Sequence, residues 1–164
     1  MDRMDARRSK INYYLDIADA AQERSTCLRR RYGAIIVRDD EIVSTGYNGA
    51  PRGRRNCIDL KYCARQNMNI PAGERYELCR SVHAEANAII SAARRDMLGG
   101  TLYLVGRDAA TGRINPDTTP CAMCRRLIIN AGIQKVVART GPGDEDYETI
   151  LVRDWVYKDD SLEK

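Results

Sequence analysis

Two short motifs in the chain combine residue types that can together bind a metal ion. The first is His83-Ala84-Glu85, which contains the single histidine of the 164-residue chain. The second is Pro120-Cys121-Ala122-Met123-Cys124. One imidazole and two thiolates supply three of the four ligands of a tetrahedral zinc site. An open fourth position is typical of a catalytic rather than a structural zinc.

Glu85 adds a group that can move protons. It lies two residues from the histidine, so we expect its carboxylate near the open position, as a general acid and base for a water molecule. The alternatives are a solvated carboxylate at Glu85, and a buried histidine with two unligated cysteines. Each motif alone arises by chance, but the pair, each opening a predicted helix after a loop, favours the zinc site.

The histidine motif opens the first of these helices. Alanine and isoleucine residues recur at three- and four-residue spacing after Glu85. This pattern predicts a helix that begins after Ser81, as its N-cap, and ends near Asp96.

The cysteine motif opens the second helix. Thr119 is its predicted N-cap, Pro120 takes the first helical position, and Gly132 is predicted to end it. Cys121 and Cys124 are three residues apart, so they share a face in the first turn, where the helix dipole favours thiolate.

Further strands and helices must position these two helices. We expect a helix over residues 10–25 and strands over residues 101–105, 134–138 and, at an edge, 148–152. Two β-rich runs, residues 32–38 and 41–47, flank Asp39-Asp40 and predict a hairpin. This order predicts a three-layer α/β/α domain with a mixed central sheet, whose strands over 101–105 and 134–138 run parallel.

Length and composition indicate one soluble domain over residues 1–164, with 43% apolar and 30% charged residues. We expect no membrane partner and a cytoplasmic location, because neither a membrane-spanning run nor a signal peptide is recognisable. The charged tail after Tyr157 is expected to fray. The net charge of +4 comes mostly from arginine and suits anionic ligands, although each arginine cluster could also be a solvated face.

Six cysteines are many for a chain in a reducing compartment, and they favour metal ligation over disulfides. Residues 48–80 form an irregular insertion, which needs a cross-link to hold a single conformation. Removing the pair in the second motif leaves four cysteines, the number that a closed structural zinc site requires. These four are Cys27, Cys57, Cys63 and Cys79. The alternative is that one or two of them are ordinary buried thiols.

Several further segments follow one another in an order that resembles a known family. They are Ser25-Thr26-Cys27, Thr45-Gly46-Tyr47-Asn48-Gly49-Ala50-Pro51-Arg52-Gly53, Asn56-Cys57, Cys79-Arg80 and the histidine motif. Over roughly residues 8–140 the chain resembles the zinc-dependent deoxycytidylate (dCMP) deaminases. The resemblance implies a cytidine-deaminase-like fold and hydrolysis of dCMP to dUMP and ammonia. It also implies a homohexamer regulated by dCTP and dTTP.

The same resemblance implies roles for single residues. Glu85 would carry protons between water and the base, Asn48 would hydrogen-bond the nucleoside, and the backbone at Ala84 would contact the cytosine edge. Arg29 would hold the 5′-phosphate, although Arg30 or Arg31 could serve instead. Some family members also bind a second zinc in the region of the insertion.

Two other hypotheses about the function stay open. The cysteine motif also resembles the tRNA adenosine deaminases, and polynucleotide cytosine deaminases share the core. With one tryptophan, no phenylalanine and no long basic tail, we expect no nucleic-acid partner, although the tyrosines could stack on bases. A catalytically inactive, zinc-stabilised binding module is the remaining alternative.

Overall fold

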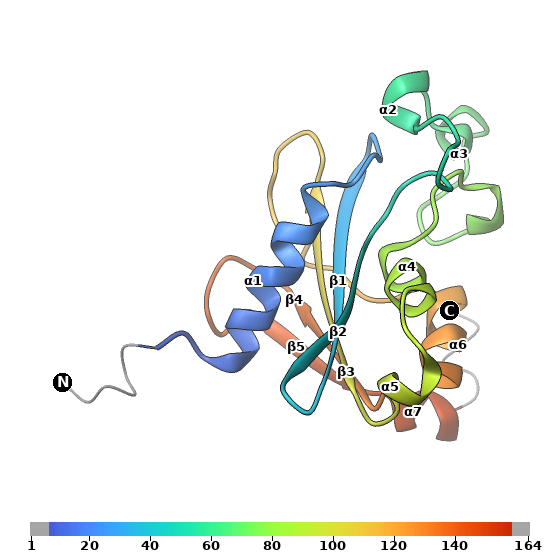
Figure 1. Ribbon diagram of the computed structural model, residues 1–164. Helices are drawn as coiled ribbons and strands as arrows, with labels where there is room; N and C mark the ends of the chain where they lie inside the picture. The colour runs from blue at the N-terminus through green and yellow to red at the C-terminus, as the bar shows by residue number, and fades with distance from the viewer. Residues whose placement is uncertain (1–6, 159–164) are drawn as a thin grey trace.

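The computed structural model describes residues 7–158, which form a sheet flanked by helices (Figure 1). The strands are β1 (Arg30–Arg38), β2 (Glu41–Tyr47), β3 (Thr101–Asp108), β4 (Lys135–Arg139) and β5 (Tyr147–Leu151). The helices are α1 (Lys10–Gln22), α2 (Cys57–Leu60), α3 (Ala64–Asn67), the 3-10 turn η1 (Tyr76–Leu78), α4 (Ala84–Ile90), α5 (Arg94–Met97), α6 (Ala122–Ala131) and α7 (Val152–Tyr157). Among these residues no helix is long and apolar enough to cross a membrane.

The sheet is mixed, as predicted, with the strand order β2-β1-β3-β4-β5. Strand β1 runs antiparallel to both of its neighbours, and β3 and β4 are the predicted parallel pair. Strand β5 pairs antiparallel with β4 at one edge. The hairpin prediction is also confirmed, because Asp39 and Asp40 connect β1 to β2 with the positive φ angles of 51° and 63° that a tight turn requires.

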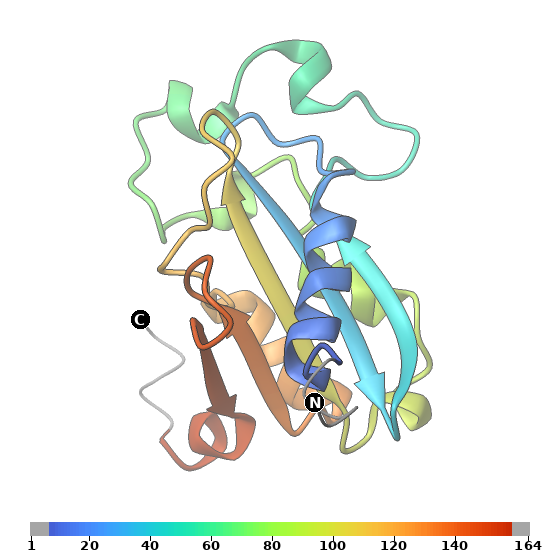
Figure 2. The ribbon, with the colours of Figure 1, turned by 90° about the vertical axis from the view of Figure 1, so that its left-hand side faces the viewer.

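Helices cover both faces of the sheet, which confirms the three-layer α/β/α architecture. Helix α1 lies on one face, and α4 and α6 lie on the other (Figures 1 and 2). Alternate residues of the strands point to opposite faces. Thus Ile35 belongs to the core under α1, whereas Ile36 belongs to the core under α4 and α6.

Both ligand-bearing helices begin two residues later than the sequence predicts. The N-cap of α4 is His83 rather than Ser81, because Val82 is extended and exchanges two backbone hydrogen bonds with Gly49. The N-cap of α6 is Cys121 rather than Thr119, because the Cys121 backbone is itself extended, with ψ at 169°. The prediction that Gly132 ends α6 is confirmed by its left-handed φ of 79°.

The ends of other helices also differ from the prediction. Helix α4 ends at Ile90, not near Asp96, because the Ser44 hydroxyl donates to the Ala88 carbonyl at 2.6 Å and the Ala92 amide bonds Ile89 instead. A separate helix, α5, follows. Helix α1 stops at Gln22 rather than residue 25, and α7 was not predicted.

The insertion over residues 48–80 contains only single turns of helix, α2, α3 and η1, joined by loops. It lies beyond one end of the sheet, near the starts of α4 and α6 (Figure 1). The bridge between Gly49 and Val82 closes its base. The predicted fraying after Tyr157 falls almost wholly outside the described residues.

Candidate active site

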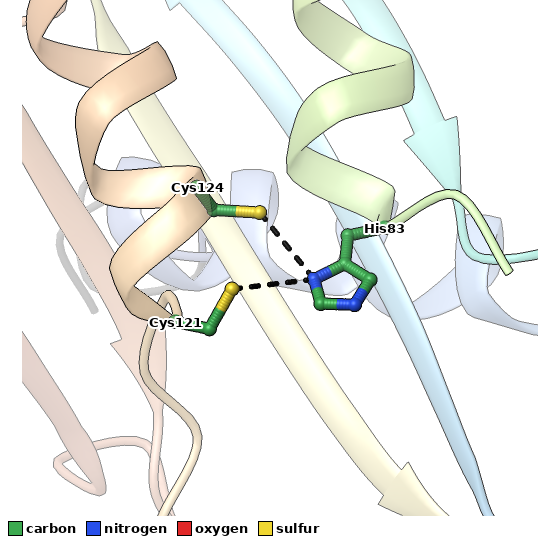
Figure 3. Close-up of side chains that lie close together, drawn as sticks. All are labelled: His83, Cys121 and Cys124. Carbon is green, nitrogen blue, oxygen red and sulfur yellow. Dashed lines mark hydrogen bonds between the residues drawn. The ribbon is translucent and has the colours of Figure 1, made fainter. Parts of the chain in front are cut away.

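The structure brings His83, Cys121 and Cys124 together from two helix starts (Figure 3). The His83 Nδ1 atom lies 3.4 Å from the Cys121 sulfur and 3.5 Å from the Cys124 sulfur. All three donor atoms lie within 4.8 Å of one another. Within residues 7–158 this is the one group of three or more histidine, cysteine or acidic side chains that could hold a metal ion.

This donor set fits zinc. Two thiolates and an imidazole are the soft and borderline ligands that tetrahedral zinc takes, and three protein ligands leave one position for a small molecule. Because His83 and Cys121 have extended backbones at the N-caps, their side chains are held at the helix ends rather than along the helix sides. Neither side chain is used to cap its helix.

The ligand group shares protons. Hydrogen bonds from Cys124 and with His83 outweigh burial and lower the pKa of the Cys121 thiol to about 4. The Cys121 bond has the opposite effect on Cys124, whose pKa is raised. Burial lowers the pKa of His83, but hydrogen bonds with Cys121 and Cys79 outweigh it and raise that pKa to about 10. A divalent metal would displace these shared protons, as expected of thiolate and imidazole ligands.

Glu85 is buried beside this group. It is 5% exposed in the first turn of α4, and its carboxyl group hydrogen-bonds with Cys124. Burial raises the pKa of Glu85 above its usual range. A buried carboxyl group whose pKa is raised suits a role in giving and taking protons.

Glu85, His83 and Cys121 line one cavity. Guanidinium, phenol and amide groups form other parts of its wall: Arg29, Arg30, Tyr32, Asn48, Arg65 and Tyr76. The cavity therefore combines a metal-binding group and a carboxyl group with several positive charges.

A family model for the cytidine and deoxycytidylate deaminase zinc-binding region matches residues 8–140. The chain belongs to this deaminase family. It is 38% identical over 130 residues to the deoxycytidylate deaminase of Mycobacterium phage D29, covering 76% of this chain and 90% of the phage protein. It is 34% identical over 147 residues to the deoxycytidylate deaminase of Schizosaccharomyces pombe, covering 90% of this chain but 42% of the yeast protein.

A solved structure supports the deaminase fold. The dCMP deaminase of cyanophage S-TIM5, in a crystal structure described as a complex with dCMP and dUMP, superposes with a TM-score of 0.54 at 25% identity. The superposition covers 85% of this chain and 83% of the cyanophage chain.

Asn48, for which the family resemblance implies a hydrogen bond to the nucleoside, lies in the wall of the cavity. It is 5% exposed, and most of its amide is used within the protein. Its oxygen accepts from the Ser25 hydroxyl at 2.5 Å and the Tyr32 amide at 2.9 Å, and its nitrogen donates to the Arg30 carbonyl at 2.9 Å. One amide hydrogen is left for a ligand.

The remaining predictions for substrate binding concern three arginines and Ala84. Arg29 and Arg30 line the cavity, whereas Arg31 does not, so the structure narrows the predicted choice among three arginines. Ala84 is fully buried as the first residue of α4, between two cavity-lining residues.

Among the described residues, no three of the other four cysteines form a group that could hold a metal ion. Cys27, Cys63 and Cys79 line the cavity, whereas buried Cys57 lines a separate hollow. Burial and the electrostatic effect of the other three thiols raise the pKa of Cys57. All four are free thiols.

Tyr32, Arg65 and Tyr76 are among the cavity-lining residues that sequence reasoning missed. Tyr32 lies near the start of β1, and its hydroxyl accepts a hydrogen bond from the Asn115 side-chain amide at 3.3 Å. Arg65 and Tyr76 come from the insertion, where no periodicity or motif marks them.

Proposed function

We propose that this chain hydrolyses dCMP to dUMP and ammonia, with zinc held by His83, Cys121 and Cys124. The observation that carries the proposal is the buried Glu85 beside the three donor atoms, in a cavity that also contains arginines. Such a cavity suits a ligand with a polar base at one end and a phosphate at the other. The names of the phage and yeast relatives support this choice of substrate.

The proposed chemistry divides between the metal and the chain. When bound, zinc would supply the Lewis acidity that makes water a nucleophile at neutral pH. Glu85 would take one proton of the attacking water and deliver it to N3 of the base while C4 is attacked. It would then take the remaining proton of the new C4 hydroxyl and deliver it to the amine, which leaves as ammonia as the C4 carbonyl of dUMP forms. Its burial keeps bulk water from exchanging these protons.

Other residues would orient the nucleotide. The free amide hydrogen of Asn48 would bind the nucleoside, and the backbone at Ala84 would contact the cytosine edge. Arg29 or Arg30 would bind the 5′-phosphate, for which a guanidinium fork is well suited.

An ammonia-release assay with dCMP, CMP, deoxycytidine and dCTP tests the proposal. We expect the highest kcat/KM with dCMP. Glu85→Gln should retain zinc and lose about 10²- to 10⁴-fold in kcat, the usual contribution of a general acid and base. Glu148→Gln, at an exposed position of β5, is the matched control and should retain wild-type activity.

The same assay distinguishes the rival functions. If the wild-type protein binds zinc but turns over no cytosine nucleotide, a zinc-stabilised binding module is favoured. Salt-sensitive binding of single-stranded DNA or of tRNA, with deamination of that polymer, would favour a polynucleotide deaminase.

We also propose a second, structural zinc bound by Cys27, Cys57, Cys63 and Cys79. The electrostatic effect of the other three thiols on Cys57 supports it. Binding one ion would require the insertion to move until the four sulfur atoms reach ligand distance. Metal analysis should give two zinc ions per chain, and Cys57→Ser should reduce the value to one. A wild-type value of one would contradict the second site.

We further propose that residues 1–164 act as one domain in a homohexamer regulated by dCTP and dTTP. Apolar side chains that α4 and α6 leave exposed, Ile90, Met123 and Leu127, support self-association. Light scattering with and without each nucleotide tests both statements. The cytoplasmic location stays a prediction from the sequence.

A further inference from the structure

Arg65 is a buried arginine in the wall of the candidate active site. It is 6% exposed, on the single helical turn α3 of the insertion. Its Nε atom donates to the Glu74 carbonyl at 3.1 Å, and Nη2 donates to the Pro71 carbonyl at 2.6 Å. Its guanidinium lies over the Tyr76 ring, 4.4 Å from the centroid. These contacts fix the group in one position.

The guanidinium still lacks an acidic partner. Among residues 7–158, no carboxylate forms an ion pair with Arg65, and the hydrogen bonds of its side chain do not use Nη1. Buried charges are normally paired, because removing a lone charge from water is costly. An anion in the cavity would supply the missing partner and would accept hydrogen bonds from Nη1.

Tyr76 connects Arg65 with the metal-binding group. The edge of the Tyr76 ring faces the His83 imidazole, with centroids 5.1 Å apart and an interplanar angle of 82°. The Tyr76 ring therefore lies between Arg65 and the proposed metal ligand His83, and Arg65 and His83 line the same cavity. A nucleotide whose base reaches the metal group could thus extend its phosphate toward Arg65.

Two other arginines line the cavity but are more exposed than Arg65. Arg29 is half-buried and Arg30 is exposed. A fixed guanidinium loses less conformational entropy when it binds a ligand than a mobile one does. Burial also weakens the competition of water for its hydrogen bonds.

We propose that Arg65 is a specificity-determining residue, whose Nη1 group binds the phosphate of a pyrimidine nucleoside monophosphate. The inference rests on the proposed function and gives the insertion a part in substrate choice. Arg29 and Arg30 would then lie at the outer side of the phosphate, where they are exposed to solvent.

The test compares kcat/KM for dCMP and for deoxycytidine, which lacks the phosphate, in the zinc-loaded protein. Arg65→Gln removes the charge. Arg75→Gln is the control, because Arg75 belongs to the same insertion, is exposed and does not line the cavity. The inhibition constants of dUMP and deoxyuridine give a second comparison that needs no turnover of the nucleoside.

We expect Arg65→Gln to lower kcat/KM for dCMP about 10- to 100-fold, mainly through KM, the usual effect of losing hydrogen bonds to a charged group. The values for deoxycytidine and the inhibition by deoxyuridine should be unchanged. Arg75→Gln should resemble the wild type with both substrates. An equal loss for dCMP and deoxycytidine would overturn the proposal, since a residue that only supports the Pro71–Glu74 turn affects both.

Arg65→Lys covers the case in which the glutamine variant does not fold, since it keeps the charge and the stem but loses the planar fork. It should retain part of the preference for dCMP, and equal losses on both substrates would again overturn the proposal. An unchanged preference in Arg65→Gln would do the same. A wild-type protein that releases no ammonia from either compound would instead contradict the proposed function itself.

Discussion

Replacing Gly46 with alanine tests whether the contact between α4 and β2 sets the geometry of the site. A Cβ atom at Gly46 would lie 2.4 Å from the Ala84 carbonyl oxygen and 2.5 Å from the Ala88 nitrogen. Ordinary contacts begin at 3.4 Å, so the helix must move away by about 1 Å. Both contacts are with backbone atoms, so no side-chain rotation relieves them. Ala84 stands between His83 and Glu85, which must move with it.

The expected magnitudes follow from this displacement. Overpacking costs about 1–3 kcal/mol, and each kcal/mol lowers Tm by about 2–4 °C in a domain of this size. We therefore expect Tm to fall by about 2–12 °C. A displacement of about 1 Å costs on the order of 100-fold in rate, so kcat/KM for dCMP should fall about 100-fold in molecules that remain folded.

Hydrogen bonds between β2 and α4 give the displacement a definite cost. The Ser44 hydroxyl donates to the Ala88 carbonyl at 2.6 Å, and the Asn87 side chain donates to the Tyr47 carbonyl at 2.8 Å. Both bonds lengthen if α4 moves outward. The assay is a thermal melt together with kcat/KM at a temperature well below Tm, normalised to the folded fraction.

Gly100→Ala is the matched control for Gly46→Ala. Its Cβ would lie 2.9 Å from the Met97 carbonyl oxygen and 3.0 Å from the Val37 carbonyl oxygen. These backbone contacts lie beside the start of β3, at the opposite end of the sheet from the site. Tm should fall while kcat/KM per folded molecule is kept. Full activity in Gly46→Ala, or an equal activity loss in both variants, would refute the reasoning.

Three further predictions concern the metal, a buried amide and an ion pair. A chelator should abolish ammonia release and lower Tm, and added zinc should restore both in the wild type but not in Cys124→Ser. Asn48→Ala should lower the free energy of unfolding by about 1–3 kcal/mol in urea titrations, because one buried and two partly buried hydrogen bonds lose their partner. Hydrogen bonding with Arg8 lowers the pKa of Asp16, which also pairs with Arg139. Because the pKa of Asp16 is lower in the folded protein, its ion pairs stabilise the fold at pH values above the usual pKa of 3.8. This stabilisation is lost as the pH falls through the lowered pKa. The Tm deficit of Asp16→Asn should therefore disappear as the pH falls below that value, and a deficit that persists in acid would contradict the assignment. The deficit at neutral pH should correspond to less than about 1 kcal/mol, since Asp16 is half-exposed and water screens the pair.

The sequence predicts the layers and strands well because their signals are local. Alternation of apolar residues marks each strand, and an acidic dipeptide marks the hairpin turn. The errors fall where distant residues intervene. Val82 pairs with Gly49, so α4 begins late, and Ser44 takes the Ala88 carbonyl, so α4 ends early. Neither partner could be identified from the helical segment alone.

The site residues, too, were predicted where the signal is local and missed where it depends on distant contacts. His83, Glu85 and the cysteine pair were found because each motif is short and its residue types are unusual together. Arg65 could not be found, because its significance depends on which carbonyls and ring surround it. Predictions for the four other cysteines relied on their number, and a count says nothing about how far apart the sulfur atoms lie.

The sheet topology explains why the two motifs meet although 35 residues separate Glu85 from Cys121 in the chain. Strands β2 and β3 both run antiparallel to β1, so they point the same way and their carboxyl ends lie at the same end of the sheet. Helix α4 follows β2 and α6 follows β3, so both helices begin at that end and lie on one face (Figure 1). The insertion joins β2 to α4, so it must also lie at that end of the sheet. An insertion there becomes part of the cavity wall, whereas one at the opposite end of the sheet could not touch the substrate. The residues that bind the substrate can therefore change with the insertion while the metal-binding group stays fixed by the sheet.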